Sequence, residues 1–336
     1  MKPCMFCGKE IQDEARKCRY CGKMQQKEET ASSIFGRIRS SAQIRSGGGF
    51  GKSMGIFMAA NAGIMVVLML IVRMFEPDAG LGTALLLLLI GGAIPFGMLF
   101  FSKPLLKWQY KIRIITEEDA KDDQEKYLLE LVQTLANRAN LPAVPEVGIY
   151  ESAEMNAFAT GASRSDSMIA FSSGLLKQMD RNSIAGVAAH ETAHIANGDM
   201  LTMTLLQSLI NIAVIVIDFA LEQMDWYEEL SKKSRFLSWL VHFVIVNVLF
   251  LLGDLILLWF SRHREFEADA TAASLVGADS MAGALRSLMD DSHAGETVAA
   301  DDPAAAMMIS APPAWTDVLS THPSLERRIE RLTEKK

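Results

Sequence analysis

The stretch His190-Glu191-Thr192-Ala193-His194 has the pattern H-E-x-x-H. On an α-helix, residues four apart lie on one face, so the two imidazoles can reach one metal ion. Glu191 lies beside the first histidine, where its carboxylate can polarise a water molecule on that metal. The flanking residues 184–189 and 195–196 are small and apolar, which predicts a buried helix. The stretch therefore predicts a zinc site with Glu191 as its base.

A catalytic zinc needs a third protein ligand and an open position for water. Residues 261–270 read S-R-H-R-E-F-E-A-D-A and hold several candidate ligands. Glu265 and Asp269 are four apart, so Glu265 can bind the metal while Asp269 accepts a hydrogen bond from a ligand imidazole. His263, Glu267 or Asp269 could be the ligand instead. Taken alone, the cluster could also be the solvated start of a charged helix.

The chain has four cysteines, and all of them lie in two C-x-x-C-G motifs near the N-terminus. Each motif lets two thiolates bind one metal, and the following glycine permits the left-handed turn behind them. Two such motifs predict a closed structural zinc ribbon, although iron would fit the same ligands. A pair of disulfides, or four free thiols, is the alternative. The predicted ligands are Cys4, Cys7, Cys18 and Cys21.

The composition and two long uncharged runs predict a membrane protein. Half of its 336 residues are hydrophobic, and the runs 56–72 and 79–101 carry no charged residue. At about 1.5 Å per residue, each run can cross, or nearly cross, a bilayer core of about 30 Å. Basic residues flank both outer ends of this pair, which predicts a cytoplasmic N-terminus and a cytoplasmic following domain. The net charge of −7 argues against nucleic acid as a partner.

Two further apolar runs, 200–217 and 236–253, have polar residues in or beside them. We predict that they are the third and fourth spans and that they border the site, because polar groups in membranes face protein or water. A helical hairpin lying partly in the soluble domain is the alternative. Basic residues again follow the last run, so both termini and the site are expected on the cytoplasmic side of the inner membrane.

The segment between the two pairs of runs reads as a soluble α+β domain. Apolar periodicity predicts a helix over 122–137, and short β-rich stretches predict strands at 146–150, 156–160 and 168–172. Asn182 or Ser183 is expected to cap the H-E-x-x-H helix, and Gly198 to end it. The expected division is a zinc ribbon (1–24), a basic flexible linker (25–53), two spans (54–116), the first part of the metal-binding domain (117–199), two further spans (200–260) and its second part (261–336).

Four segments of the chain, in their order and spacing, resemble the HtpX-type membrane zinc metalloproteases, relatives of the CAAX prenyl endopeptidases. They read N-A-F-A-T-G at 156–161, H-E-T-A-H-I-A-N-G-D at 190–199, S-R-H-R-E-F-E-A-D at 261–269 and T-H-P-S-L-E-R-R-I at 321–329. The resemblance covers roughly residues 54–333, so it does not extend to the cysteine motifs.

The resemblance implies a gluzincin-like core in a four-span protein. It implies that His190, His194 and Glu265 bind zinc and that Glu191 is the base. It further implies that His322 and Arg328 lie near the site, where His322 could stabilise an oxyanion. The segment implied to pair, as an edge strand, with the substrate backbone consists of Asn156, Ala157, Phe158, Ala159 and Thr160.

The expected fold is thus a multi-span α-helical membrane protein with a cytoplasmic α+β metalloprotease domain and a small N-terminal zinc ribbon. The expected reaction is hydrolysis of peptide bonds in misfolded or damaged membrane proteins. Two rival functions are a prenyl-protein endopeptidase and a membrane adaptor or holdase that binds zinc without cleaving. The expected partners are polypeptide substrates and the lipid bilayer.

Overall fold

The structure is a computed structural model that describes residues 2–3, 9–12, 19–20, 29–43, 82, 94–222, 224–292 and 322–334. The four cysteines of the predicted ribbon lie outside these residues, although two short strands near them, β1 (Lys2–Pro3) and β2 (Glu10–Ile11), pair antiparallel. The apolar run 56–72, and most of the run 79–101, also lie outside the described residues.

A four-stranded sheet forms one layer of the soluble domain. Its strands are β3 (Arg113–Ile115), β4 (Glu146–Tyr150), β5 (Ala157–Ser163) and β6 (Asp166–Ser172), in the order β3-β4-β6-β5. Strands β4 and β6 run parallel, and the other pairs are antiparallel. All three predicted strands are therefore present, and the strand that begins beside Asn156 lies at an edge of the sheet.

Helices α5 (Asp123–Arg138) and α7 (Arg181–Asn197) contribute apolar side chains to the main core, together with one face of the sheet. Helix α7 carries the H-E-x-x-H pattern and is buried along most of its length. Its N-cap is Asp180, whose carboxylate accepts a hydrogen bond from Ser183 N at 2.7 Å, so the predicted caps Asn182 and Ser183 are wrong. Gly198 ends the helix in a left-handed conformation, as predicted.

The opposite face of the sheet packs against the end of α4 (Ile94–Gln109) and the residues that follow it. Leu106 and Tyr110 contact Phe158 and Met168 there, and the rings of Tyr110 and Phe158 lie 5.9 Å apart. Lys107 pairs with Glu146 of β4 at 2.5 Å. This helix continues the second apolar run, so the contacts fix the sheet against the end of that run.

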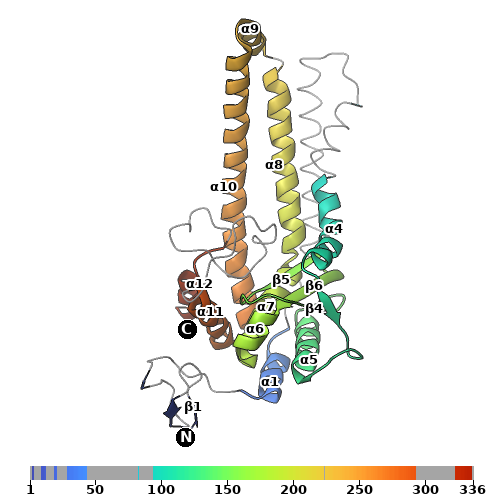
Figure 1. The fold of residues 1–336 in the computed structure, drawn as a ribbon, viewed down its shortest axis with the longest axis vertical. Helices are drawn as coiled ribbons and strands as arrows, with labels where there is room; N and C mark the ends of the chain where they lie inside the picture. Colours follow the sequence, from blue (N-terminus) through green and yellow to red (C-terminus); the bar gives the residue numbers. More distant parts are fainter. Residues whose placement is uncertain are drawn as a thin grey trace.

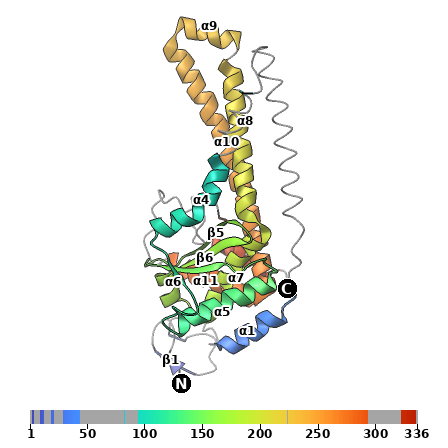
Figure 2. The same cartoon turned by 90° about the vertical axis from the view of Figure 1, so that its right-hand side faces the viewer.

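Helices α8 (Asp199–Glu222) and α10 (Arg235–Val276) form a long hairpin that rises from the soluble domain, with α9 (Asp225–Lys233) at its tip (Figures 1 and 2). Within the described residues, α10 is long and apolar enough to cross a membrane. Helix α8 passes the same test together with α7, from which it is bent by 54°. The run 236–253 and the cluster 261–269 belong to one helix of 42 residues, so the predicted boundary between them does not interrupt it.

The C-terminal part of the domain is helical. Helix α10 is followed by α11 (Ala278–Ser292), which packs against α7 and α12 (Leu325–Thr333). A short helix, α6 (Ser173–Gln178), follows β6 directly. These elements enclose α7, so the helix with the two histidines lies inside the domain (Figure 2).

The segment 25–53 was expected to be a flexible linker, and over residues 31–40 this expectation is wrong. These residues form α1 (Ala31–Ser40), which packs on α5, α7 and α10. Ile34, Phe35 and Ile38 share one helical face and are buried in the main core. Arg37 donates a hydrogen bond to Asn182 at 2.7 Å, and this bond joins the start of α7 to α1.

The close packing of α7 against α11 gives a stability prediction. A Cβ on Gly186 would lie 2.8 Å from Ala284 Cβ and 2.9 Å from Ser280 O, so Gly186→Ala must push the two helices apart. We expect a loss of about 1–3 kcal/mol, as for other overpacked cores. Gly36→Ala in the exposed face of α1 meets nothing within 4 Å and serves as the control. Equal thermal unfolding midpoints for the two variants would contradict this packing.

Candidate active site

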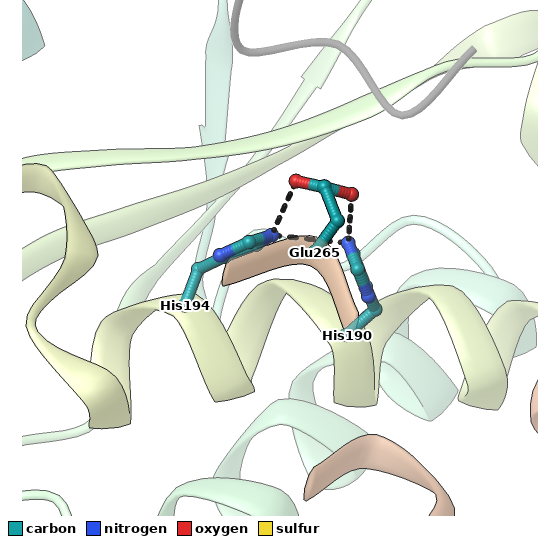
Figure 3. Close-up of side chains that lie close together, drawn as sticks. All are labelled: His190, His194 and Glu265. Atoms are coloured by element: carbon teal, nitrogen blue, oxygen red, sulfur yellow. Dashed lines mark hydrogen bonds and ion pairs between the residues drawn. The ribbon is translucent and has the colours of Figure 1, made fainter. Parts of the chain in front are cut away.

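Helix α7 places His190 and His194 on one face, and α10 places Glu265 opposite them (Figure 3). The two Nε2 atoms lie 3.0 Å apart. The Glu265 carboxylate spans the pair, with Oε2 at 3.4 Å from His190 Nε2 and Oε1 at 3.3 Å from His194 Nε2. His190 and Glu265 are each 1 % exposed, so these groups converge inside the protein.

Each imidazole has its own carboxylate on the side away from Glu265. His190 Nδ1 lies 3.0 Å from Asp269 Oδ1, as the spacing of Glu265 and Asp269 predicted. His194 Nδ1 lies 2.5 Å from Asp199 Oδ2. A carboxylate accepts a hydrogen bond from the N–H that faces it, so both neutral rings keep the proton on Nδ1. Both Nε2 lone pairs then point at the same volume.

This arrangement attracts positive charge. Burial opposes a charged imidazole, but hydrogen bonds to Asp199 and Glu265 outweigh burial and raise the pKa of His194 to about 10. A zinc ion supplies the same charge and displaces the proton. Tetrahedral ligands at about 2.0–2.1 Å from zinc are separated by about 3.3 Å. The observed separations of 3.0–3.4 Å agree with that value, so the residues fit the metal.

The other candidates for the third ligand face away from this volume. His263 and Glu267 pair with each other at 3.6 Å, and their side chains are 54 % and 60 % exposed. Asp269 is buried but contacts the Nδ1 side of His190. The structure thus brings Glu265 to the two histidines and leaves Asp269 in the supporting position that the sequence predicted.

Arg328 of α12 holds the two acids of α10 in place. It donates to both oxygens of Asp269, from Nε at 2.8 Å and from Nη2 at 2.7 Å, and its Nη1 lies 3.2 Å from Glu265 Oε2. Burial opposes the charged form of Asp269, but the guanidinium outweighs burial and lowers the pKa of this carboxyl to about 2. The arginine is fully buried, so both carboxylates depend on it for compensation of charge.

His322 and Glu191 complete the group of predicted site residues. His322 is 6 % exposed, and its Nδ1 lies 3.0 Å from Glu265 Oε2. Glu191 is 3 % exposed, and burial raises the pKa of its carboxyl. A raised pKa brings a carboxylate closer to the range in which it can accept and return a proton near neutrality.

The predicted substrate segment precedes and enters the edge strand β5. Phe158 and Thr160 face α4, where Thr160 Oγ1 donates to Ser102 Oγ at 3.2 Å, while Ala157 and Ala159 join the core on the α7 side. Both backbone groups of Asn156 are hydrogen-bonded to Ser172. The Asn156 N–H donates to Ser172 Oγ, and the Asn156 carbonyl accepts from the Ser172 N–H. The side-chain Oδ1 of Asn156 is buried without a hydrogen-bond partner among the described residues.

Two contributors to the site were absent from the sequence prediction, namely Asp199 and Arg264. Asp199 follows His194 by five residues, one more than the i, i+4 spacing that sequence patterns use. Arg264 precedes Glu265 and donates from Nη1 to the Asp199 backbone O at 2.8 Å. The sequence N-G-D after the second histidine was the available signal, because glycine there permits a reversal of the chain.

A helix-borne pair of histidines with a glutamate from a second helix is the ligand set of zinc metalloproteases of the gluzincin type. Residues 122–336 match the family described as Peptidase family M48, and the chain belongs to this family. It is therefore a zinc-dependent protease.

Relatives agree with this assignment over most of the chain. The chain is 35 % identical over 303 residues to "Protease HtpX homolog" of Bacillus pumilus, a match that covers 85 % of this chain and all of the relative. It is 37 % identical over 291 residues to "Protease HtpX" of Tolumonas auensis, which covers 83 % of this chain and 98 % of the relative. The chain is a membrane zinc endopeptidase that resembles these proteins.

A solved structure supports the fold. The crystal structure of S. mikatae Ste24p matches with a TM-score of 0.54 and 18 % sequence identity. The match covers 84 % of this chain and 65 % of that one. At this identity the likeness shows a shared fold.

Arg328 gives a prediction for the site. Arg328→Gln leaves two buried carboxylates without their guanidinium, so we expect a loss of about 3–5 kcal/mol, as for other broken buried pairs. The thermal unfolding midpoint in detergent should fall accordingly. Arg327→Gln is the matched control, since the neighbouring arginine is exposed on the same helix. If the two variants unfolded at the same temperature, Arg328 would not compensate these charges.

Proposed function

We propose that this protease cleaves misfolded or damaged membrane proteins at the cytoplasmic membrane surface. The observation that carries the proposal is the position of His194, which lies five residues before Asp199, the first residue of the apolar helix α8. The site therefore lies within about one helical turn of the hairpin. Chain segments released from the bilayer would emerge beside it.

An extended substrate suits this site. β5 lies at the edge of the sheet and packs against α7. An edge strand binds an extended peptide through main-chain hydrogen bonds, which depend little on side chains. The Oδ1 of Asn156, which has no hydrogen-bond partner within the described part of the chain, can accept a further bond from the substrate backbone. Recognition of backbone, rather than of a particular sequence, suits substrates whose shared feature is loss of fold.

Each residue of the site has a separate role in the proposed peptide hydrolysis. His190, His194 and Glu265 hold the zinc, which when bound polarises the scissile carbonyl and lowers the pKa of water. Glu191 takes a proton from the attacking water and delivers it to the leaving amine. His322 donates a hydrogen bond to the carbonyl oxygen as negative charge develops there. Asp269 and Arg328 fix the orientation of His190 and Glu265.

The proposed topology has four spans, with both termini and the site in the cytoplasm. Hairpin α8–α10 supplies two spans, and its exposed apolar residues, including Phe236, Leu251 and Trp259, suit contact with lipid. The other two spans are the runs 56–72 and 79–101. A membrane-impermeant thiol reagent applied from outside should label a cysteine placed in α9 and spare one placed in α11. The reverse pattern would contradict this orientation.

Glu191 and Glu267 provide the test of the catalytic proposal. Glu191→Gln keeps the size of the side chain and removes the base, so cleavage should fall by about 10²–10⁴-fold. Zinc content should stay unchanged, because Glu191 is not a ligand. Glu267→Gln is the control on the exposed side of α10. The assay is cleavage of an unfolded membrane protein by the purified chain.

Three outcomes of this assay would contradict the proposal. Full activity of Glu191→Gln would remove the base from the mechanism. Absence of cleavage by the unaltered, zinc-loaded chain would favour an adaptor or holdase. Cleavage confined to prenylated C-terminal peptides would favour a prenyl-protein endopeptidase.

We further propose that Cys4, Cys7, Cys18 and Cys21 hold a second, structural zinc. Four thiolates close a tetrahedral site and leave no open position. Elemental analysis of the purified chain should then find about two metal ions per chain, and replacement of Cys4 and Cys7 by serine should remove one. Cleavage of a simple substrate should persist in that variant. A single metal in the unaltered chain would contradict the ribbon.

A further inference from the structure

The carboxylate beside His194 comes from a membrane helix. Asp199 is the first residue of α8, it is 4 % exposed, and its Oδ2 lies 2.5 Å from His194 Nδ1. Gly198, with φ of 75°, reverses the chain between the two residues. A residue with a Cβ adopts this conformation with difficulty, so the glycine lets Asp199 reach back to the helix that precedes it.

Asp199 is itself held by the second membrane helix of the hairpin. Arg264 of α10 donates from Nη1 to the Asp199 backbone O at 2.8 Å, and its Nε lies 4.0 Å from Asp199 Oδ1. The Arg264 side chain is 13 % exposed, so solvent screens this contact weakly. The next residue along α10 is Glu265, so one turn of this helix supplies a metal ligand and also the cation that fixes Asp199.

Each of the two histidines therefore has its own carboxylate and arginine behind it, and the two sets are separate. His190 contacts Asp269, which is held by Arg328 of α12 in the soluble domain. His194 contacts Asp199, which is held by Arg264 at the foot of the hairpin. In each case a carboxylate faces the ring. Arg328 donates to the Asp269 carboxylate itself, whereas Arg264 donates to the backbone carbonyl of Asp199 and lies 4.0 Å from its carboxylate. The second set also depends on how α8 and α10 meet.

We propose that Asp199 is a positioning residue that fixes the ring and the Nδ1 proton of His194, and that Arg264 acts through Asp199 to tie this ligand to the membrane hairpin. This inference rests on the proposed role of His194 as a zinc ligand. Carboxylates behind ligand imidazoles typically change metal affinity by about 10–100-fold. The hairpin thereby contributes to zinc binding in two ways. It supplies the ligand Glu265, and it holds the ligand His194 in position through Asp199 and Arg264.

The test measures zinc affinity of the full chain in detergent by competition with a chromogenic chelator. Asp199→Ala should weaken zinc binding by about 10–100-fold. Asp199→Asn keeps a hydrogen-bond acceptor and should lose less. Asp225→Ala is the matched control, because Asp225 is also the first residue of its helix and is exposed. It removes the same charge from a helix N-terminus and should leave zinc affinity unchanged.

Cobalt substitution supplies a readout that a loss of stability alone does not change. The visible absorption bands of cobalt in the site should shift in Asp199→Ala, because His194 turns, and should return towards those of the unaltered chain in Asp199→Asn. Arg264→Gln should weaken zinc binding, and the double variant with Asp199→Ala should bind no more weakly than Asp199→Ala alone. This lack of additivity is expected when one residue acts through another.

The outcomes separate this inference from the assignment of the ligands. If Asp199→Ala bound zinc as tightly as the unaltered chain, with the same cobalt spectrum, the proposal would be overturned. Additive losses in the double variant would overturn the role of Arg264. His194→Ala is measured in parallel, since unchanged zinc affinity in that variant would show that the ligand assignment itself is wrong.

Discussion

Two imidazole nitrogens, both with lone pairs and only 3.0 Å apart, are the constraint on which this domain depends. Neutral acceptors at this separation repel each other. Either a positive charge lies between them, or the core around α7 holds them together at a cost in folding free energy. Among the residues that the structure describes, the charged side chains around the pair are Glu191, Asp199, Arg264, Glu265, Asp269 and Arg328. As ionised groups they leave two negative charges, which one divalent cation neutralises.

Close packing keeps this charged group together. Gly186 allows α11 to approach α7, and the apolar residues of α5 and the sheet exclude water from the other side. In such surroundings an unpaired charge is expensive, which explains why an arginine lies near each carboxylate behind a histidine. The fold and the metal chemistry are thus stabilised by the same set of side chains.

Sequence spacing predicted those parts of the site whose geometry is local. His190 and His194 share a face because α7 is a helix, and Glu265 and Asp269 were found in the same way on α10. The chain separation between His190 and Arg328 is 138 residues, so this contact came from family resemblance and not from any pattern. Asp199 was missed because its contact requires the left-handed turn at Gly198. Helix α1 was missed because its apolar residues lie in a segment dominated by polar ones, although Ile34 and Ile38 had the spacing of a buried face.

The order of the site residues along the chain has a consequence for biosynthesis. The ribosome makes His190 and His194 before it makes α8 and α10, and Glu265 and Arg328 follow the hairpin. The nascent chain therefore holds two of its three proposed zinc ligands before the hairpin has been made. A complete donor set exists only after α10 has returned to the domain. The order of synthesis thus leaves the zinc site incomplete until the hairpin has been made and α10 has packed on the domain.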